Sequence, residues 1–185
     1  YKPIKAKKSF LMVARMIKNK GVFEFCECAR KVKEKYPDAV FDYLGWEGNV
    51  KVADIKEYLD DGSVNYLGVT SDARPYYEEC TALILPSYRE GMPVSVMEAQ
   101  ATGRAVIVTN VAGCRETARD GYNGFIVPAA NADALAEKAI FMIEHPEETR
   151  KMGENARLFA EENFDRKKIN ERVLAISEKI SEEQA

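Results

Sequence analysis

Between residues 82 and 103 the chain reads ALILPSYREGMPVSVMEAQATG, which is an apolar run, a turn and a longer mixed segment. The apolar run over residues 82–85 has the length and composition of a buried strand. Pro93 suits the first turn of a helix, where an amide N–H has no partner in any case. We therefore expect a strand, a turn at its carboxyl end, and a helix over residues 93–102.

Two carboxylates lie eight residues apart in this stretch. Glu90 is in the turn, beside the expected helix N-terminus, and Glu98 is inside the helix. Val94, Met97 and Ala101 repeat at helical spacing and are expected to be buried, with Glu98 at the edge of their stripe. Because an unpaired buried carboxylate costs several kcal/mol, protein donors or ligand hydroxyl groups must satisfy it. The stretch predicts a site for a polyhydroxylated ligand that carries negative charge.

Six short apolar runs are separated by helical or turn-rich segments and are expected to be strands. They are residues 9–14, 39–44, 64–67, 82–85, 105–109 and 124–127. Helices are expected over residues 21–36, 50–59, 74–79, 93–102, 132–144, 147–163 and 166–180. This alternation predicts an α/β domain with a doubly wound parallel sheet. Ligands of such sheets bind beyond the carboxyl ends of the strands.

The composition is that of an ordinary globular domain, with 46% hydrophobic and 31% charged residues among 185. A net charge of -3 argues against a nucleic-acid partner bound through overall basicity. No apolar run approaches the ~20 residues that span a bilayer, and no signal peptide is evident, so a cytoplasmic protein is expected. No metal site is expected, because metal-ligand spacing is absent from the four cysteines, Cys26, Cys28, Cys80 and Cys114.

A basic loop follows the first expected strand. Arg15 and Lys20 precede Gly21, which opens the first expected helix. Cations beside the free N–H groups of a helix N-terminus form a pocket for phosphate or pyrophosphate. Basic loop residues are more often simply solvated, so the prediction depends on the carboxylates further along the chain.

Four motifs occur together along the sequence. The first is Arg15 with Lys20-Gly21, and the second is Pro-Ser-x-x-Glu-Gly-x-Pro, which contains Glu90 and is followed by Glu98. The others are Gly113-Cys114-Arg115-Glu116 and Asp120-Gly121-x-Asn123-Gly124. Together they resemble the C-terminal, donor-binding lobe of family 4 retaining glycosyltransferases, which have the GT-B fold. The resemblance extends from Phe10 to about Phe164. Within the family it is nearest to enzymes of capsule, O-antigen and lipid-linked oligosaccharide assembly. It implies a Rossmann-like sheet of about six strands.

The resemblance also implies a role for each motif residue. Arg15 and Lys20 would hold the donor diphosphate and offset the charge of the departing nucleoside diphosphate, so that neither a metal nor a cofactor is needed. Glu98 would accept hydrogen bonds from the ribose hydroxyls, and Glu90 would contact the transferred sugar. The other implied donor-binding residues are Gly91, Met92, Val94, Val69 and Thr70. Trp46 either borders the same pocket or packs over the sheet.

The implied organisation has three parts. Residues 1–8 are expected to be a linker from a missing N-terminal lobe, and residues 9–163 the donor-binding domain. Residues 164–185 are expected to form a C-terminal helix that packs back on the domain or toward the missing lobe. That lobe would hold a saccharide or lipid-linked saccharide acceptor, and the full-length enzyme would associate peripherally with the inner face of the membrane. The isolated chain is expected to bind its ligand without catalysing transfer.

The expected function is binding of a nucleotide-diphosphate sugar, UDP-sugar by default, in an enzyme that transfers a hexose or N-acetylhexosamine. A nucleotide-sugar epimerase or phosphorylase, and a non-catalytic nucleotide-sugar-binding module, are the alternatives. A dehydrogenase is disfavoured because no G-x-G-x-x-G follows the first strand, and a P-loop NTPase because its phosphate-binding motif is absent. The nucleobase, the sugar and the acceptor remain open.

Overall fold

The computed structural model describes residues 8–183, apart from the side chains of residues 172, 178, 179 and 181–183. Its centre is one sheet of six parallel strands in the order β3-β2-β1-β4-β5-β6. The strands are β1 (Ser9–Val13), β2 (Val40–Leu44), β3 (Asn65–Tyr66), β4 (Ala82–Leu85), β5 (Ala105–Thr109) and β6 (Gly124–Val127). Strand order reverses between β1 and β4, which confirms the doubly wound, Rossmann-like fold and places the crevice of the sheet at this point.

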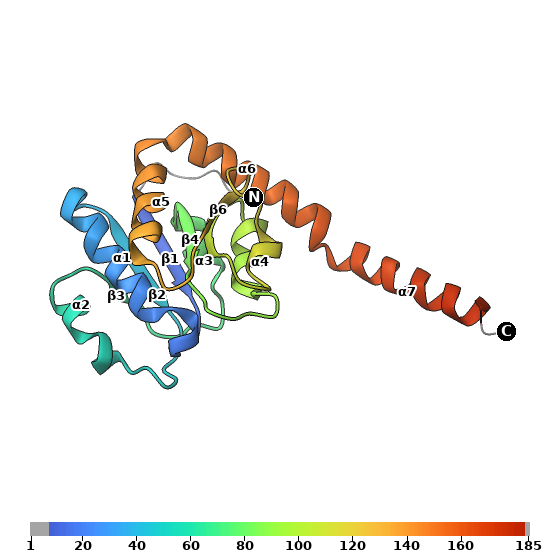
Figure 1. The fold of residues 1–185 in the computed structure, drawn as a ribbon, viewed down its shortest axis with the longest axis horizontal. Helices are drawn as coiled ribbons and strands as arrows, with labels where there is room; N and C mark the ends of the chain where they lie inside the picture. Colours follow the sequence, from blue (N-terminus) through green and yellow to red (C-terminus); the bar gives the residue numbers. More distant parts are fainter. Residues whose placement is uncertain (1–7, 184–185) are drawn as a thin grey trace.

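Helices cover both faces of the sheet (Figure 1). They are α1 (Val22–Lys35), α2 (Lys56–Asp60), α3 (Arg74–Glu79), α4 (Val94–Ala101), α5 (Ala132–Glu144), α6 (Pro146–Asn163) and α7 (Arg166–Glu183). The crossovers through α1 and α4 run in opposite directions from the centre, so right-handed connections place these two helices on opposite faces. α5 packs beside α1, and α6 packs on α4.

The core begins where aromatic rings from the sheet meet α1. Phe10 of β1 and Phe41 of β2 stack with ring centroids 4.9 Å apart, and Phe25 of α1 meets Phe41 edge-on at 5.7 Å. All three rings are fully buried. Burial of each large apolar side chain contributes about 1.5–3 kcal/mol, so this cluster fixes α1 and the loop before it against the sheet.

Two elements are shorter than expected. The helix expected over residues 50–59 is a 3-10 helix, η2 (Val52–Ile55), followed by the five-residue α2. Its start is fixed locally, because the backbone N–H of Lys51 donates to Asp54 at 2.7 Å. β3 has two residues in place of four, since at the edge of the sheet it pairs with β2 alone. Neither difference moves the carboxyl end of a central strand.

The expected buried stripe of α4 is wrong. Val94 is 59% exposed, and the buried residues of the helix are Val96, Ala99 and Gln100. On this buried side Val96 and Ala99 pack in the core, and the Gln100 side-chain amide donates to the backbone carbonyl of Thr117 at 2.6 Å. Glu98 is therefore exposed and not at the edge of a buried stripe.

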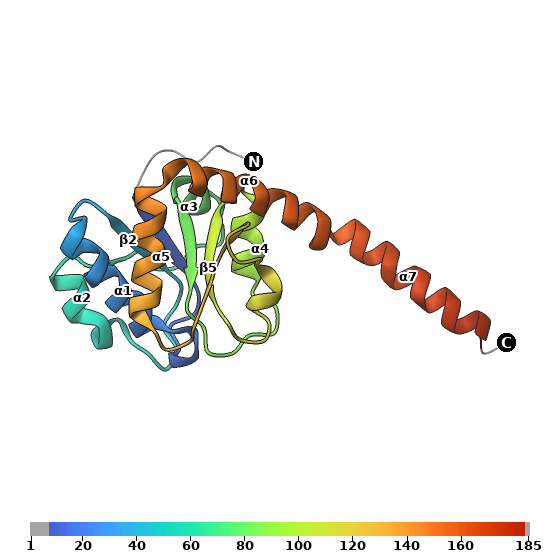
Figure 2. The same ribbon diagram turned by 45° about the horizontal axis from the view of Figure 1, so that its top comes forward.

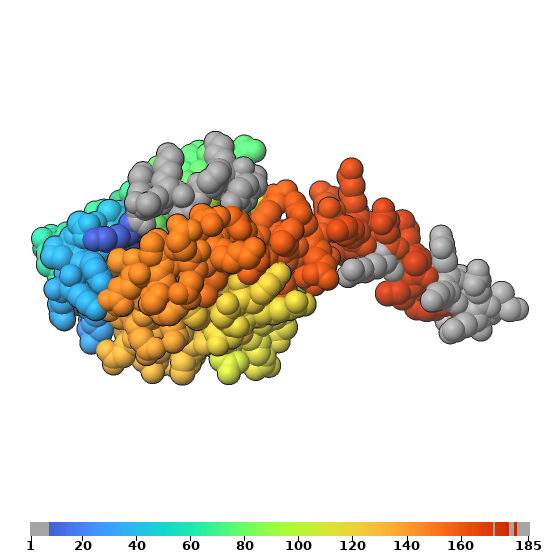
Figure 3. Space-filling model, turned by 90° about the horizontal axis from the view of Figure 1, so that it is seen from above, coloured from blue at the N-terminus to red at the C-terminus, as the bar shows by residue number. Residues whose placement is uncertain are grey.

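α7 extends away from the body of the domain (Figures 1 and 2). Figure 3 shows α6 lying along the body and α7 projecting beyond it. The described apolar side chains of α7 are exposed; they are Ile169, Val173, Leu174, Ile176 and Ile180. The expectation that this helix covers the domain or a further lobe stays a prediction. Within residues 8–183 no helix combines the length and apolarity needed to cross a bilayer.

Substitutions at Gly21 and Gly62 test how closely the loop after β1 approaches the loop after β4. Their φ angles are 75° and 73°. A Cβ on Gly21 would lie 2.1 Å from the carbonyl oxygen of Pro86, whereas nothing lies within 4 Å of one on Gly62. We expect Gly62→Ala to lower the free energy of unfolding by about 1–2 kcal/mol and Gly21→Ala by about 3 kcal/mol or more. Urea unfolding measures the stability of both variants. Equal losses of stability would contradict the close approach of Gly21 to Pro86.

Candidate functional site

The loops that follow β1 and β4 are joined at the crevice of the sheet. The backbone N–H of Tyr88 donates to the carbonyl of Asn19 at 2.8 Å. The Tyr88 hydroxyl donates to Glu24 of α1, so the loop after β4 is attached both to the loop after β1 and to the helix that follows it. The buried Thr109 hydroxyl of β5 donates to the carbonyl of Ser87 and holds the β4 loop from the other side. These bonds fix the backbone on both sides of the residues that sequence analysis selected.

Lys20 and Glu90 meet at this junction. Lys20 Nζ lies 2.5 Å from Glu90 Oε1, and the Ser87 hydroxyl donates to the same oxygen at 2.6 Å. The Glu90 side chain is only 8% exposed, so the ion pair lies partly outside bulk solvent, where charges attract more strongly than in water. Lys20 is the cation expected to bind phosphate, and Glu90 is the carboxylate expected to contact the sugar. In the structure these two side chains pair with each other.

The loop after β5 forms the third side of this cluster. A Cβ on Gly113 would lie 2.2 Å from the carbonyl oxygen of Gly91, so the two loop backbones are in direct contact. Glu116 accepts from the N–H of Gly113 at 2.7 Å and shapes the turn. Burial, with a smaller contribution from the charge of Glu90, raises the pKa of the Cys114 thiol to about 11. Cys114 is therefore a protonated packing residue at neutral pH and not a nucleophile.

Arg15 borders a neighbouring cavity of about 170 Å³ at the carboxyl ends of β1 and β2. Its guanidinium is exposed and has no hydrogen bond or ion pair with any residue from 8 to 183. Trp46 and Val69 are each 57% exposed and line the same cavity, together with Thr70. Trp46 therefore borders this pocket and does not cover the sheet. The arrangement is a free cation beside an apolar surface.

Glu98 lines an adjoining pocket of about 570 Å³, between the start of α3 and the side of α4. Thr70 and Ala73 border both pockets, so the two are neighbours along the carboxyl edge of the sheet, and we call them together the recess. Glu98 Oε2 accepts a hydrogen bond from the Tyr77 hydroxyl at 2.9 Å. The Thr70 hydroxyl is bonded to the backbone of Asp72 at 3.1 Å, which fixes the loop between the pockets.

Two helix N-termini point toward this edge of the sheet. α1 begins after Gly21 and α4 after Pro93, and neither helix has a side-chain cap. The first backbone N–H groups of each helix therefore have no partner within the helix. Such N–H groups, together with the positive end of the helix dipole, favour a bound anion.

The structure brings the predicted residues together in two groups. Lys20, Glu90 and Gly91 lie at the junction of the three loops, while Arg15, Thr70 and Glu98 border the recess, with Val69 beside Arg15. Met92 and Val94 are exposed at the start of α4. No hydrogen bond among the described residues connects Glu90 to Glu98.

Sequence reasoning missed two contributors to the site. Ser87 lies three residues before Glu90, a spacing that was visible and is common in turns. Tyr77 reaches Glu98 across 21 positions of the chain, so no local pattern indicates their contact.

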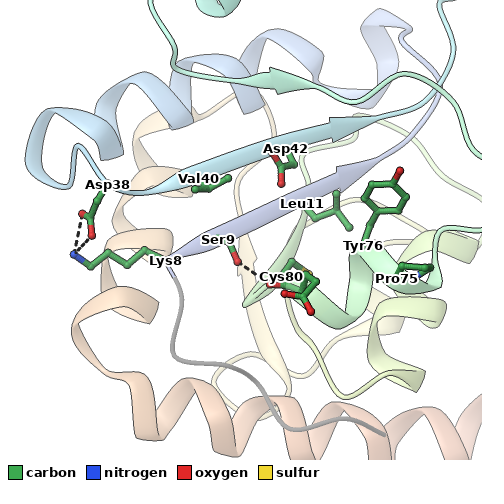
Figure 4. A pocket seen from close by; sticks show the side chains of 10 residues that line it. Lys8, Ser9, Leu11, Asp38, Val40, Asp42, Pro75, Tyr76 and Cys80 are labelled. Carbon is green, nitrogen blue, oxygen red and sulfur yellow. Dashed lines mark hydrogen bonds and ion pairs between the residues drawn. The ribbon is translucent and has the colours of Figure 1, made fainter.

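Another pocket, of about 560 Å³, lies at the amino-terminal ends of β1 and β2 (Figure 4). Lys8 pairs there with Asp38 at 2.9 Å, and the Ser9 hydroxyl donates to the carbonyl of Glu79 at 3.1 Å. It is lined by none of the predicted site residues. It is no larger than the Glu98 pocket, and in open α/β sheets ligands bind at the opposite, carboxyl end, so this pocket is not the candidate site.

Comparisons with known proteins establish the family. Residues 2–159 match the family model "Glycosyl transferases group 1", and the chain belongs to this family. A Campylobacter jejuni N,N'-diacetylbacillosaminyl-diphospho-undecaprenol alpha-1,3-N-acetylgalactosaminyltransferase is 35% identical over 170 residues. The alignment covers 92% of this chain and 44% of that relative, so the chain spans less than half of the relative's length.

Solved structures give the same fold. The C-terminal domain of a group 1 family protein from Francisella tularensis matches with a TM-score of 0.76 and 25% identity, covering 85% of this chain and 87% of that domain. Anabaena Alr3699/HepE, solved in complex with UDP, matches with a TM-score of 0.85 and 20% identity, covering 96% of this chain and 49% of that one. The fold expected from the resemblance is thereby confirmed.

Lys20 and Lys18 lie in the same turn and test the partly buried ion pair. Replacing Lys20 with methionine leaves the largely buried Glu90 carboxylate without its cation, so we expect the free energy of unfolding to fall by about 1–3 kcal/mol. Lys18 is exposed, and Lys18→Met is expected to change the free energy of unfolding by less than about 0.5 kcal/mol. Urea unfolding in phosphate-free buffer measures both variants. If the two were equally stable, Glu90 would not depend on Lys20.

Proposed function

We propose that this chain is the donor-binding part of a retaining glycosyltransferase whose donor is a nucleotide-diphosphate sugar, with UDP as the expected nucleotide. The observation that carries the proposal is the recess along the carboxyl edge of the sheet. Arg15 provides a free cation in one of its pockets, and Glu98 provides a carboxylate in the other. A nucleoside diphosphate presents an anion and a ribose diol, which are the groups that these two side chains bind.

The phosphate-binding part is formed by positive charge from three sources. Arg15 contributes a planar guanidinium that can bind phosphate in a bidentate manner, and Lys20 contributes a point charge. The uncapped N-termini of α1 and α4 contribute backbone N–H groups. These groups offset the charge that develops on the departing diphosphate, a role in which we assign no metal and no cofactor.

The ribose is assigned to Glu98. The side chain is exposed, and in the described structure Oε1 has no partner while Oε2 is held by Tyr77. A ribose hydroxyl that donates to an ionised carboxylate contributes about 1.5–3 kcal/mol. The nucleobase then lies toward Val69, Thr70 and Trp46, which line the adjoining cavity.

Glu90 is assigned to the transferred sugar, and the ion pair explains how it becomes available. In the structure Lys20 pairs with Glu90 and neutralises its charge. A bound diphosphate attracts Lys20, and Glu90 is then left with the hydroxyl of Ser87 and free acceptor positions. Backbone groups of Gly91, Met92 and Val94 at the mouth of the crevice complete the donor contacts.

The remainder of the enzyme is also a proposal. The printed name of the Campylobacter jejuni relative describes transfer of N-acetylgalactosamine to a saccharide linked to diphospho-undecaprenol. By analogy we assign a hexose or N-acetylhexosamine to the donor and a saccharide, free or lipid-linked, to a second lobe. That lobe would meet the exposed stripe of α7, where Ile169, Val173 and Ile176 repeat at spacings of four and three. The site of action would be the cytoplasmic face of a membrane.

Calorimetry with UDP, GDP, ADP and uridine tests the binding function on this chain. We expect UDP to bind and Arg15→Met to weaken UDP about tenfold or more, because one charge-assisted phosphate contact is lost. The affinity for uridine is expected to change by less than about twofold, and the loss for UDP is expected to shrink at high salt. Removal of divalent ions with EDTA is expected to leave UDP binding unchanged.

Lys18→Met, in the same loop, serves as the charge-matched control. If Arg15→Met weakened uridine and UDP equally, Arg15 would support the fold and not the phosphates. If none of the three nucleotides bound, the proposed function would be wrong.

A further inference from the structure

Glu98 is an exposed carboxylate that is nevertheless held in one position. Water can solvate its charge, so the carboxylate does not need a protein partner. An unrestrained Glu side chain populates several rotamers, and ordering it costs up to about 2 kcal/mol. The Tyr77 hydroxyl donates to Oε2 at 2.9 Å and leaves Oε1 without a partner among residues 8–183. Both side chains line the pocket of about 570 Å³ between α3 and α4.

Tyr77 is well suited to act as a fixed donor. The residue is only 1% exposed, so its ring is fixed by packing, and its hydroxyl lies within hydrogen-bond distance of Glu98. Burial and, to a lesser extent, the charge of Glu98 raise the pKa of Tyr77 far above its usual range. The phenol therefore keeps its proton at neutral pH and can donate it to the Glu98 carboxylate.

The backbone of Tyr77 is anchored as well. Arg104 at the start of β5 is fully buried, and its guanidinium donates to the carbonyl of Tyr77 at 2.6 Å and to the carbonyl of Glu78 at 2.9 Å. These are carbonyl groups of the last turn of α3, which have no partner within the helix. A buried cation thus fixes the position of Tyr77 relative to the sheet.

We infer that Tyr77 is the positioning residue for Glu98, and that Arg104 holds Tyr77 in place for this purpose. The inference rests on the proposed function, in which Glu98 accepts the ribose hydroxyls. Tyr77 holds one carboxylate oxygen so that the other faces the pocket before the ligand arrives. Pre-ordering of this kind raises affinity because less freedom is lost on binding. The recognition unit for the ribose is therefore Glu98 together with Tyr77, and it spans α3 and α4.

The test compares Tyr77→Phe with Tyr76→Phe in the 185-residue chain, using UDP and its 2′,3′-dideoxy analogue in calorimetry. Tyr76 is the neighbouring tyrosine of α3 but lines the pocket of Figure 4. We expect Tyr77→Phe to lower the affinity for UDP about three- to tenfold, which is the effect of one hydrogen bond. The affinity for the dideoxy analogue should fall by less than about twofold. Tyr76→Phe should change either affinity by less than about twofold.

A second comparison separates positioning from general support of the fold. In a Glu98→Gln background, Tyr77→Phe should cause no further loss of discrimination between ribose and dideoxyribose, because the carboxylate that it positions is absent. The ratio of the two affinities is measured on one sample, so a partly unfolded variant still gives a valid ratio.

An unchanged ratio of the two affinities in Tyr77→Phe would overturn the inference, whether both ligands lose affinity equally or neither does. Wild-type chain that binds UDP and the dideoxy analogue equally would contradict the assignment of Glu98 itself and, with it, the inference. Wild-type chain that binds no nucleoside diphosphate would contradict the proposed function. These results are distinguishable from one another.

Discussion

The contact between the loops after β1 and β4 determines the geometry of the whole site. Strand order reverses between these two strands, so their carboxyl ends are adjacent while their following helices leave on opposite faces. Gly21 makes the contact possible, because any Cβ at this position would meet the carbonyl of Pro86. Lys20 precedes the contact on one loop and Glu90 follows it on the other, so the backbone approach brings their side chains together.

The charges of the site are distributed in a way that separates two tasks. Lys20 and Glu90 neutralise each other at the centre, where a partly buried charge without a partner would be costly. Arg15 and Glu98 lie at the outer pockets, where they are exposed and water solvates them until a ligand binds. In the proposed function, a ligand with an anion and a diol meets these exposed charges first. In the same proposal its phosphates compete with Glu90 for Lys20, and this competition would couple occupation of the nucleotide pocket to the sugar position.

Much of the fold was predictable because its signals are local. The buried strand β4 is an unbroken apolar run, and β5 is apolar up to its last residue, Thr109. The phase of α4 was not predictable, because burial of Gln100 depends on a carbonyl 17 residues away. The Lys20–Glu90 pair joins residues 70 positions apart. Sequence placed both at one edge of the sheet, but only side-chain distances reveal that they bind each other.

The central claim is that the recess along the carboxyl edge of the sheet binds a nucleoside diphosphate. It is tested most directly by titrating the ¹⁵N-labelled chain with UDP and following backbone amide shifts by NMR. The account predicts that the largest changes occur at residues 15–22, 68–72 and 91–98, with little change around Ser9 and Val40 in the pocket of Figure 4. Changes centred on Ser9, Val40 and Tyr76, or no change at any amide, would contradict it.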